Sequence, residues 1–316
     1  MNRQQQLAIA GIAGAAVLLA MPWLFGSYYL GLATKMIIFA LFAMSLDLLI
    51  GYTGLASLGH AAYFGVASYA TGLLALRLGW GVGWALPAGV LVAGLTAALF
   101  GLLALRARGS YFLMITLALS QVLWGIAFGW RSLTGGDDGL PEVPRPDLGL
   151  PWSFADNTPF YYFTLAVAVV STWLLMRVVA SPFGQSLRGI RESETRMLAL
   201  GYDTWRYKFA AFVLAGLFAG VAGVLYVYYN RFVSPDYIHV ARSAEVLLMV
   251  ILGGAGSLFG PALGAALIVL FENIVSGYTE RWLLVLGVVY VLVTLFAPDG
   301  ITGVVRRLRQ RKAGQT

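Results

Sequence analysis

The sequence predicts an all-α membrane protein, a polytopic bundle of transmembrane helices. Only 11% of its 316 residues are charged and 59% are hydrophobic, whereas a soluble domain carries about 25% charged residues. The mean hydropathy is +0.80. Apolar runs of about 20 residues, the length that crosses a hydrocarbon core of about 30 Å, recur along the whole chain. The runs are continuous rather than alternating, which argues against a transmembrane β-barrel.

Successive apolar segments predict about ten crossings, and eight to ten fit the pattern. They cover residues 7–25, 30–50, 55–76, 84–105, 111–130, 160–180, 208–229, 244–255, 258–276 and 281–297. The first lacks a small-residue cleavage site before Ser27, so we interpret it as a retained span rather than a signal peptide. The eighth and ninth form one run that is broken at 253–257. Because that run exceeds one bilayer thickness, we divide it into two crossings, the eighth of them short.

The distribution of Lys and Arg predicts the orientation. With ten crossings both termini lie on one side, and most of the 21 basic residues fall on that side, including the basic tail 304–316. The positive-inside rule then places both termini in the cytoplasm of a bacterial inner membrane. Nucleic-acid binding is disfavoured as an explanation of the net charge of +7, because the basic residues are scattered among short loops. The whole chain, 1–316, is expected to form a single transmembrane domain.

The long connection 131–159 is predicted to lie on the periplasmic side. It is acidic and punctuated by Gly and Pro, which indicates ordered turns rather than a flexible linker. A connection of this length usually has a function, and we expect it to dock a partner through Asp137, Asp138 and Glu142. The alternative is a plain connector.

The charged segment 181–208 is predicted to lie in the cytoplasm and to carry one short helix. Ser193 is a good N-cap, Glu194 favours the helix dipole in the first turn, and Gly201 is a good C-terminal stop. Such a short helix is marginal alone in water, so something must pack on it. The candidate contact residues are Arg188, Arg191, Glu192, Glu194, Met197, Leu198 and Gly201. The alternative is a solvated loop whose charges only set the topology.

Polar and glycine residues within the apolar segments are candidates for a translocation pathway. Unwound backbone at membrane depth is tolerated where it lines a cavity or is buried in protein, and ionisable groups there are functional candidates. The candidates are Asp47, Gly51, Gly54, Ser57, His60, Gly254 and Ser257, beside the charged Lys35, Glu245 and Glu272. The simpler interpretations are that Asp47 caps backbone groups and that His60 satisfies local ones. A faint similarity between 54–58 and 254–258 is equally compatible with chance.

Several chemistries find no support in the sequence. It contains no GxxxxGK[ST], so the chain has no P-loop for ATP. It has no cysteine and only two histidines, His60 and His239, so no metal site is expected. The sequence contains no GxSxG or HExxH pattern, so it gives no support to a membrane-embedded enzyme. An ion-coupled secondary transporter would need membrane-centred carboxylates, for which Asp47 and Glu272 are the candidates.

Long stretches of the chain resemble the permease subunits of ABC importers of the high-affinity branched-chain amino acid type, on the LivM side of the LivH/LivM pair. The matching stretches are 51–69, 134–140, 181–194, 198–226, 244–265 and 272–303. Two departures stand out. Asp47 occupies a place where an amide residue is expected, and Arg196-Met197 replaces the usual small residues.

The resemblance implies the ABC importer permease fold and the remaining parts of a transporter. A second homologous permease would pair with this chain, and two ABC ATPases, which bind the ATP and Mg that this chain lacks, would dock on 181–208. A periplasmic binding protein would deliver the substrate, and lipid would surround the bundle. The substrate would be a branched-chain or other apolar amino acid. Urea, short amides and aromatic carboxylates are the alternatives that the same resemblance allows.

Overall fold

A computed structural model describes residues 14, 17–146, 154, 156–279, 281–296, 300–301 and 303. Within these ranges the chain is helical, and the one strand-like pairing is an isolated bridge between Leu140 and Val233. The all-α prediction is therefore confirmed. The helices are α2 (Ser27–Thr53), α3 (His60–Leu78), α4 (Val82–Ala104), α5 (Ser110–Gly129), α6 (Arg131–Thr134), α7 (Asn157–Ala180), α8 (Pro182–Glu192), α9 (Glu194–Ala199), α10 (Thr204–Asn230), α11 (Val240–Gly253), α12 (Phe259–Ser276) and α13 (Trp282–Phe296), with 3-10 turns η1 (Gly136–Asp138) and η2 (Pro235–Tyr237).

Seven helices in the described part of the chain are long and apolar enough to cross a membrane, namely α2, α3, α4, α5, α7, α10 and α12. The predicted count of about ten crossings is thus not confirmed. The apolar run at 244–276 does divide into two helices, and α11, with 14 residues, is about 21 Å long and shorter than the hydrocarbon core. The first apolar segment, 7–25, lies largely outside the described residues.

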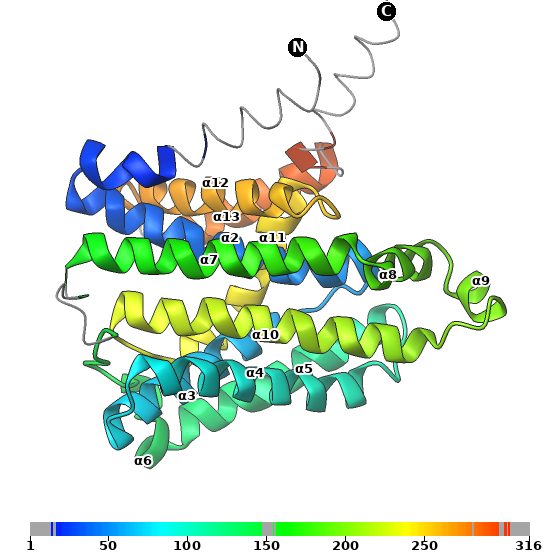
Figure 1. The fold of residues 1–316 in the computed structure, drawn as a ribbon, viewed down its shortest axis with the longest axis horizontal. Coiled ribbons are helices and arrows are strands. Elements are labelled where there is room, and N and C mark those ends of the chain that lie inside the picture. The colour runs from blue at the N-terminus through cyan, green and yellow to red at the C-terminus, as the bar shows by residue number, and fades with distance from the viewer. Residues whose placement is uncertain are drawn as a thin grey trace, which may run out of the picture.

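The centre of the bundle is formed by α2 and α10, the two longest and most buried spans. In Figure 1 they run side by side between α7 and α12 on one side and α3, α4 and α5 on the other. Small residues bring α10 close to α4: a Cβ at Gly216 would lie 2.2 Å from that of Ala97, and one at Gly220 2.6 Å from that of Ala93. Close approach through small residues is the usual packing of membrane helices.

The two long connections leave the bundle at opposite ends. In Figure 1, α6 lies at one end of the long axis and α8 and α9 lie at the other. The segments 131–159 and 181–208 are predicted to face opposite sides of the membrane, and this prediction requires them to lie at opposite ends of the bundle. Which end is cytoplasmic follows from the charge rule and stays a prediction.

The segment 181–208 contains two helices, where the sequence analysis placed one. The additional helix, α8, starts with Ser181 as its N-cap and Pro182 at its first position, a favourable start. Leu187 and Ile190 are buried and Phe183 packs beside the core, so α8 lies with an apolar face against the bundle. These three residues lie four and three positions apart, which is helical spacing. This pattern could have predicted α8 from the sequence.

Candidate coupling and translocation site

Asp47 on α2 binds the turn between α11 and α12. Its fully buried carboxylate lies on α2, and it accepts hydrogen bonds from the backbone N–H of Gly256 at 2.7 Å and of Leu258 at 3.2 Å. These two amides belong to the turn between α11 and α12. Because unpaired buried N–H groups are costly, the carboxylate fixes that turn against α2. The interpretation of Asp47 as a backbone cap is therefore the one that the contacts favour.

The turn between α11 and α12 is built from unusual backbone. Gly254 and Gly256 have φ values of +97° and +87°, and Leu258 has a φ of +29°. Ser257 closes the turn, since its hydroxyl donates to the Gly254 carbonyl at 3.0 Å and accepts from the Gly260 N–H at 3.2 Å. Left-handed backbone favours glycine, and a non-glycine residue there stores strain.

Gly51 lies in the last turn of α2, in contact with the same turn. A Cβ at this position would lie 2.2 Å from Oδ1 of Asp47 and 2.3 Å from the nitrogen of Gly256, so only glycine fits. The helix α2 ends at Thr53, and the chain from 54 to 59 is irregular, starting with Gly54 at a φ of +75°. Gly51 and Gly54 thus permit the irregular backbone between α2 and α3. Gly254 and Ser257 do the same between α11 and α12.

Arg191 connects α8 to both breaks. Its guanidinium donates a hydrogen bond to the Gly51 carbonyl. Its Cγ is 3.3 Å from where a Cβ on Gly54 would lie, and its Nη1 is 3.1 Å from the corresponding point on Gly256. One turn earlier, the Arg188 guanidinium lies over the Tyr52 ring, 5.0 Å from its centroid. Both arginines thus have partners within this chain, and their predicted contact with an ATPase stays a prediction.

The short helix α9 has the predicted termini. The Ser193 hydroxyl accepts from the N–H of Arg196 at 3.3 Å. Gly201 has a φ of +87°, its N–H bonds to the Leu198 carbonyl at 3.0 Å, and the next N–H bonds to the carbonyl of Met197 at 3.1 Å. This is a Schellman arrangement, which satisfies the last carbonyls of the helix.

Glu194 fixes α9 to the start of α10. Its carboxylate lies 2.6 Å from Nζ of Lys208 and accepts from the Thr204 hydroxyl at 3.0 Å. Partial burial disfavours the charged form, but the hydrogen bond and charge of Lys208, with smaller help from Thr204 and Arg108, outweigh it, so the pKa of Glu194 lies below its ordinary value. Glu194 is therefore a bracing residue.

The remaining predicted contact residues, Glu192 at the end of α8 and Met197 and Leu198 on α9, divide into inner and outer ones. Met197 packs on α8, because a Cβ at Gly189 would lie 2.8 Å from its sulfur. Leu198 and Leu200 are 49% and 73% exposed, Glu192 is exposed, and no residue of α9 is buried. The exposed side of α9 thus presents the apolar Leu198 and, directly after the helix, Leu200, beside the polar Thr195 and Arg196.

Ser57 and His60 belong to the core. Both are buried. Ser57 accepts from the N–H of Gly59 at 3.2 Å, whereas Nε2 of His60 lies 2.8 Å from the Ser45 hydroxyl and its ring stacks on Phe42 at 5.4 Å. This packing favours the interpretation of His60 as a core residue over a ligand contact, and its Nδ1 is buried without a hydrogen-bond partner among the described residues.

Comparison with known sequences assigns the chain to a family. Residues 28–294 match the family of branched-chain amino acid transport system permease components. The chain belongs to this family. It is 29% identical to the high-affinity branched-chain amino acid transport permease LivM of Salmonella typhimurium, over 99% of this chain and 78% of the relative, and 29% identical to LivM of Escherichia coli, over 98% and 78%. It is 26% identical to the E. coli permease LivH, over 84% and 91%.

The connection between α5 and α7 of this permease holds three exposed acidic residues on an ordered backbone. Leu140 and Val233 pair through their backbones, and the N–H of Val143 donates to the Arg231 carbonyl at 3.0 Å. The predicted docking residues all lie on this pinned segment and are exposed; they are Asp137, Asp138 and Glu142. Their role in docking stays a prediction.

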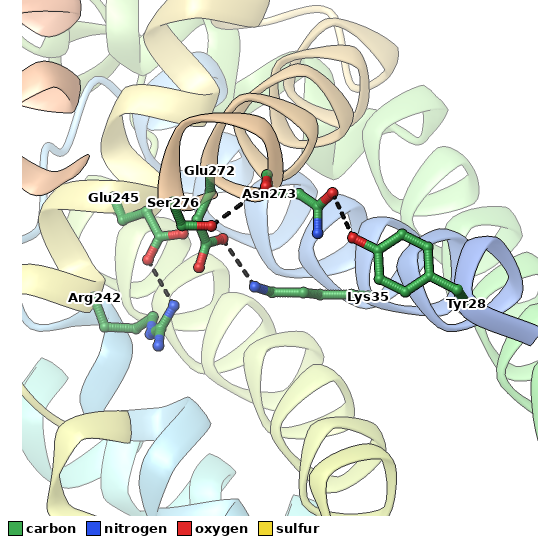
Figure 2. Close-up of polar contacts among 7 residues, drawn as sticks. All are labelled: Tyr28, Lys35, Arg242, Glu245, Glu272, Asn273 and Ser276. Atoms are coloured by element: carbon green, nitrogen blue, oxygen red, sulfur yellow. Dashed lines mark hydrogen bonds and ion pairs between the residues drawn. The ribbon is translucent and has the colours of Figure 1, made fainter. Parts of the chain in front are cut away.

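A charged cluster inside the permease was only partly foreseen. We define it as Lys35, Arg242, Glu245 and Glu272, which come together from α2, α11 and α12 (Figure 2). Lys35 bonds Glu272 at 2.8 Å and Arg242 bonds Glu245 at 2.7 Å. Sequence analysis identified three of these residues singly but missed Arg242. Its spacing of three from Glu245 on a helix was the available signal.

Proposed function

We propose that this permease is a membrane-spanning subunit of an ATP-driven importer of branched-chain or other apolar amino acids. The observation that carries the proposal is α9, which projects from the end of the bundle (Figure 1) with Leu198 and Leu200 exposed. Its six residues form too short a helix to stand alone, and this one is capped, braced and aimed outward. An apolar tip of this kind fits a groove on a partner.

The partner of α9 would be an ABC ATPase. This chain has no P-loop, so ATP and Mg would be held by two ATPase subunits, and the chain itself would need no cofactor. Movement of α9 would pass to α8 and then through Arg191 to Gly51 at the end of α2 and to Gly256 in the turn that Asp47 binds. Such a connected element can switch between two arrangements.

The proposal includes three further assignments. LivM and LivH relatives support a second homologous permease, and the substrate would pass between the two chains. A periplasmic binding protein would dock on Asp137, Asp138 and Glu142. With 181–208 and both termini in the cytoplasm, the permease would lie in a bacterial inner membrane, in contact with lipid and without a role in nucleic-acid binding.

Reconstitution tests the proposed function. The permease is co-expressed with its second permease and two ATPases, placed in liposomes and supplied with the binding protein and radiolabelled leucine. Uptake that requires ATP and stops when the ATPase P-loop lysine is replaced supports the proposal. Equal uptake by this permease without ATPases would support an ion-coupled transporter instead. ATP-driven uptake of urea, a short amide or an aromatic carboxylate, but not of leucine, would change the substrate.

A further inference from the structure

The connection between α10 and α11 is an irregular segment, 231–239, that enters the membrane-spanning part of the bundle. Near its start, Val233 pairs with Leu140 of the connection between α5 and α7. Near its end, the carbonyl of Ile238 accepts a hydrogen bond from the Ser120 hydroxyl at 3.1 Å. Ser120 lies in the middle of α5, a helix of 20 residues that is long enough to cross a bilayer. The segment therefore places non-helical backbone at membrane depth.

Asp236, in the 3-10 turn η2 of this segment, indicates that the segment does not face lipid. The residue is exposed, and its carboxylate has neither a hydrogen-bond nor an ion-pair partner among the described residues. Irregular backbone within the hydrocarbon region is tolerated only where protein or water covers it, and a carboxylate there is paired or solvated. Because Asp236 is only two residues from Ile238, protein or water must cover it in the membrane.

A groove beside the start of α11 favours protein over water as this cover. It has a volume of about 420 Å³, lies between α5, α11 and α13, and has a largely aliphatic wall on which Ala241 and Ala244 are exposed. Glu245 also borders the groove, but the residue is buried and its carboxylate bonds Arg242 within the chain. An aliphatic wall offers water few hydrogen bonds. Two small exposed residues on one side of α11 allow another helix to approach closely.

We propose that this groove receives a membrane helix of the second homologous permease, which places a basic or other hydrogen-bond-donating side chain opposite Asp236. The inference rests on the pairing in the proposed function, which the similarity to both LivM and LivH supports, and assigns that pairing to one face of the chain. The apolar side of the incoming helix would cover the aliphatic wall. The donor would supply the partner that Asp236 lacks, so this charge would set the register of the two chains.

Photo-crosslinking in the complete transporter tests where the second permease lies. A genetically encoded benzoylphenylalanine replaces Leu247, on the groove wall, in one sample. In the control sample it replaces Val170, which is 56% exposed on α7, across the central helices from α5 (Figure 1). Illumination should link the second permease at least tenfold more efficiently through position 247 than through position 170. Equal yields, or links from position 247 only to lipid or to a second copy of this chain, would overturn the inference.

Variants of Asp236 test the role of its charge. Asp236→Leu should lower co-purification of the second permease with the tagged chain by about tenfold, as expected for the loss of one charge-assisted hydrogen bond, and Asp236→Glu should retain part of it. The unfolding midpoint of this chain expressed alone should not fall, because the carboxylate has no partner within it. The matched control is Asp137→Leu, since Asp137 is also exposed but lies on the connection between α5 and α7; co-purification should stay unchanged.

Three further results would contradict the inference. The first is unchanged co-purification in Asp236→Leu, and the second is a lower unfolding midpoint of that variant alone, which would make Asp236 structural. The third is equal modification of Asp236→Cys by a water-soluble thiol reagent in the isolated chain and in the complete transporter, because only a water-lined surface stays accessible. If the unmodified chain retains no second permease, the pairing in the proposed function fails. A second permease that links only through position 170 leaves that pairing intact and refutes the groove.

Discussion

Arg191 on α8 donates a hydrogen bond to the backbone carbonyl of Gly51, in the last turn of α2. The contact links a helix at the end of the bundle to a membrane helix at the point where that helix breaks. Because a hydrogen bond that involves a charged group contributes about 1.5–3 kcal/mol, movement of α8 would be resisted by α2 or transmitted to it. Arg191 also reaches Gly256, so one side chain serves both breaks.

Replacement of Asp47 by Asn should destabilise the permease by about 1–3 kcal/mol. The carboxylate accepts two backbone N–H groups, one on each oxygen, and an amide offers only one acceptor and turns an NH₂ toward the other donor. The thermal unfolding midpoint in detergent measures the loss. Thr34→Val is the matched control, because Thr34 is also buried on α2 but bonds only within its own helix. Equal midpoints for Asp47→Asn and the unmodified permease would show that the turn does not depend on the carboxylate.

Gly201→Ala should weaken association with the ATPases through backbone strain alone. The position has a φ of +87°, and no atom lies within 4 Å of an added Cβ, so the expected cost of about 1–2 kcal/mol comes from the left-handed conformation. Co-purification of the ATPases with tagged permease measures the effect. The control is Gly125→Ala, which is also uncrowded but lies within α5 and should be neutral or slightly stabilising. If the ATPases co-purify equally well with the Gly201→Ala permease, the conformation at the end of α9 does not contribute to docking.

The brace between Glu194 and Lys208 should persist from neutral pH down to about pH 5 and fail only in stronger acid. The pKa of Glu194 is lowered from 4.5. The ionised carboxylate therefore stabilises α9 fully above 4.5, and this stabilisation is lost as pH falls through the lower folded-state pKa. The chain has no cysteine, so a spin label on Leu198→Cys reports specifically on α9.

The spectrum of that label should show α9 held at pH 7 and at pH 5 and progressively released as the pH falls below 4.5, the ordinary pKa of the carboxyl group. Glu194→Gln removes the titrating group, so the label on this background should show the same mobility at every pH. Release of the label above pH 5, or an identical pH profile in Glu194→Gln, would mean that another group holds α9.

Local signals in the sequence were sufficient for the ends of α9 and for most helix positions. Ser193 and Gly201 act within one or two turns of the backbone, so their residue types alone predict a cap and a stop. Apolar length predicts a membrane helix in the same way, although α11 is too short to cross alone. The helix α8 was missed because the charges of Arg188, Arg191 and Glu192 hid its apolar spacing.

Long-range contacts could not be predicted from the sequence. Asp47 and Gly256 are 209 positions apart, and Lys35 and Glu272 are 237 apart. Each pairing depends on how the helices pack, and packing is set by many small contacts, such as Gly216 against Ala97.

The central claim is that Arg191 transmits movement of α9 to the membrane helices, and transport efficiency tests it most directly. The measurement is leucine imported per ATP hydrolysed in proteoliposomes that contain the complete transporter. Arg191→Ala should lower this ratio by about tenfold while ATP hydrolysis continues, as expected for the loss of one charged hydrogen bond. The control is Arg177→Ala. Arg177 lies in the last turn of α7, just before α8, and stacks on Trp173, so its removal should keep the ratio. An unchanged ratio in Arg191→Ala, with the complex intact, would contradict the account.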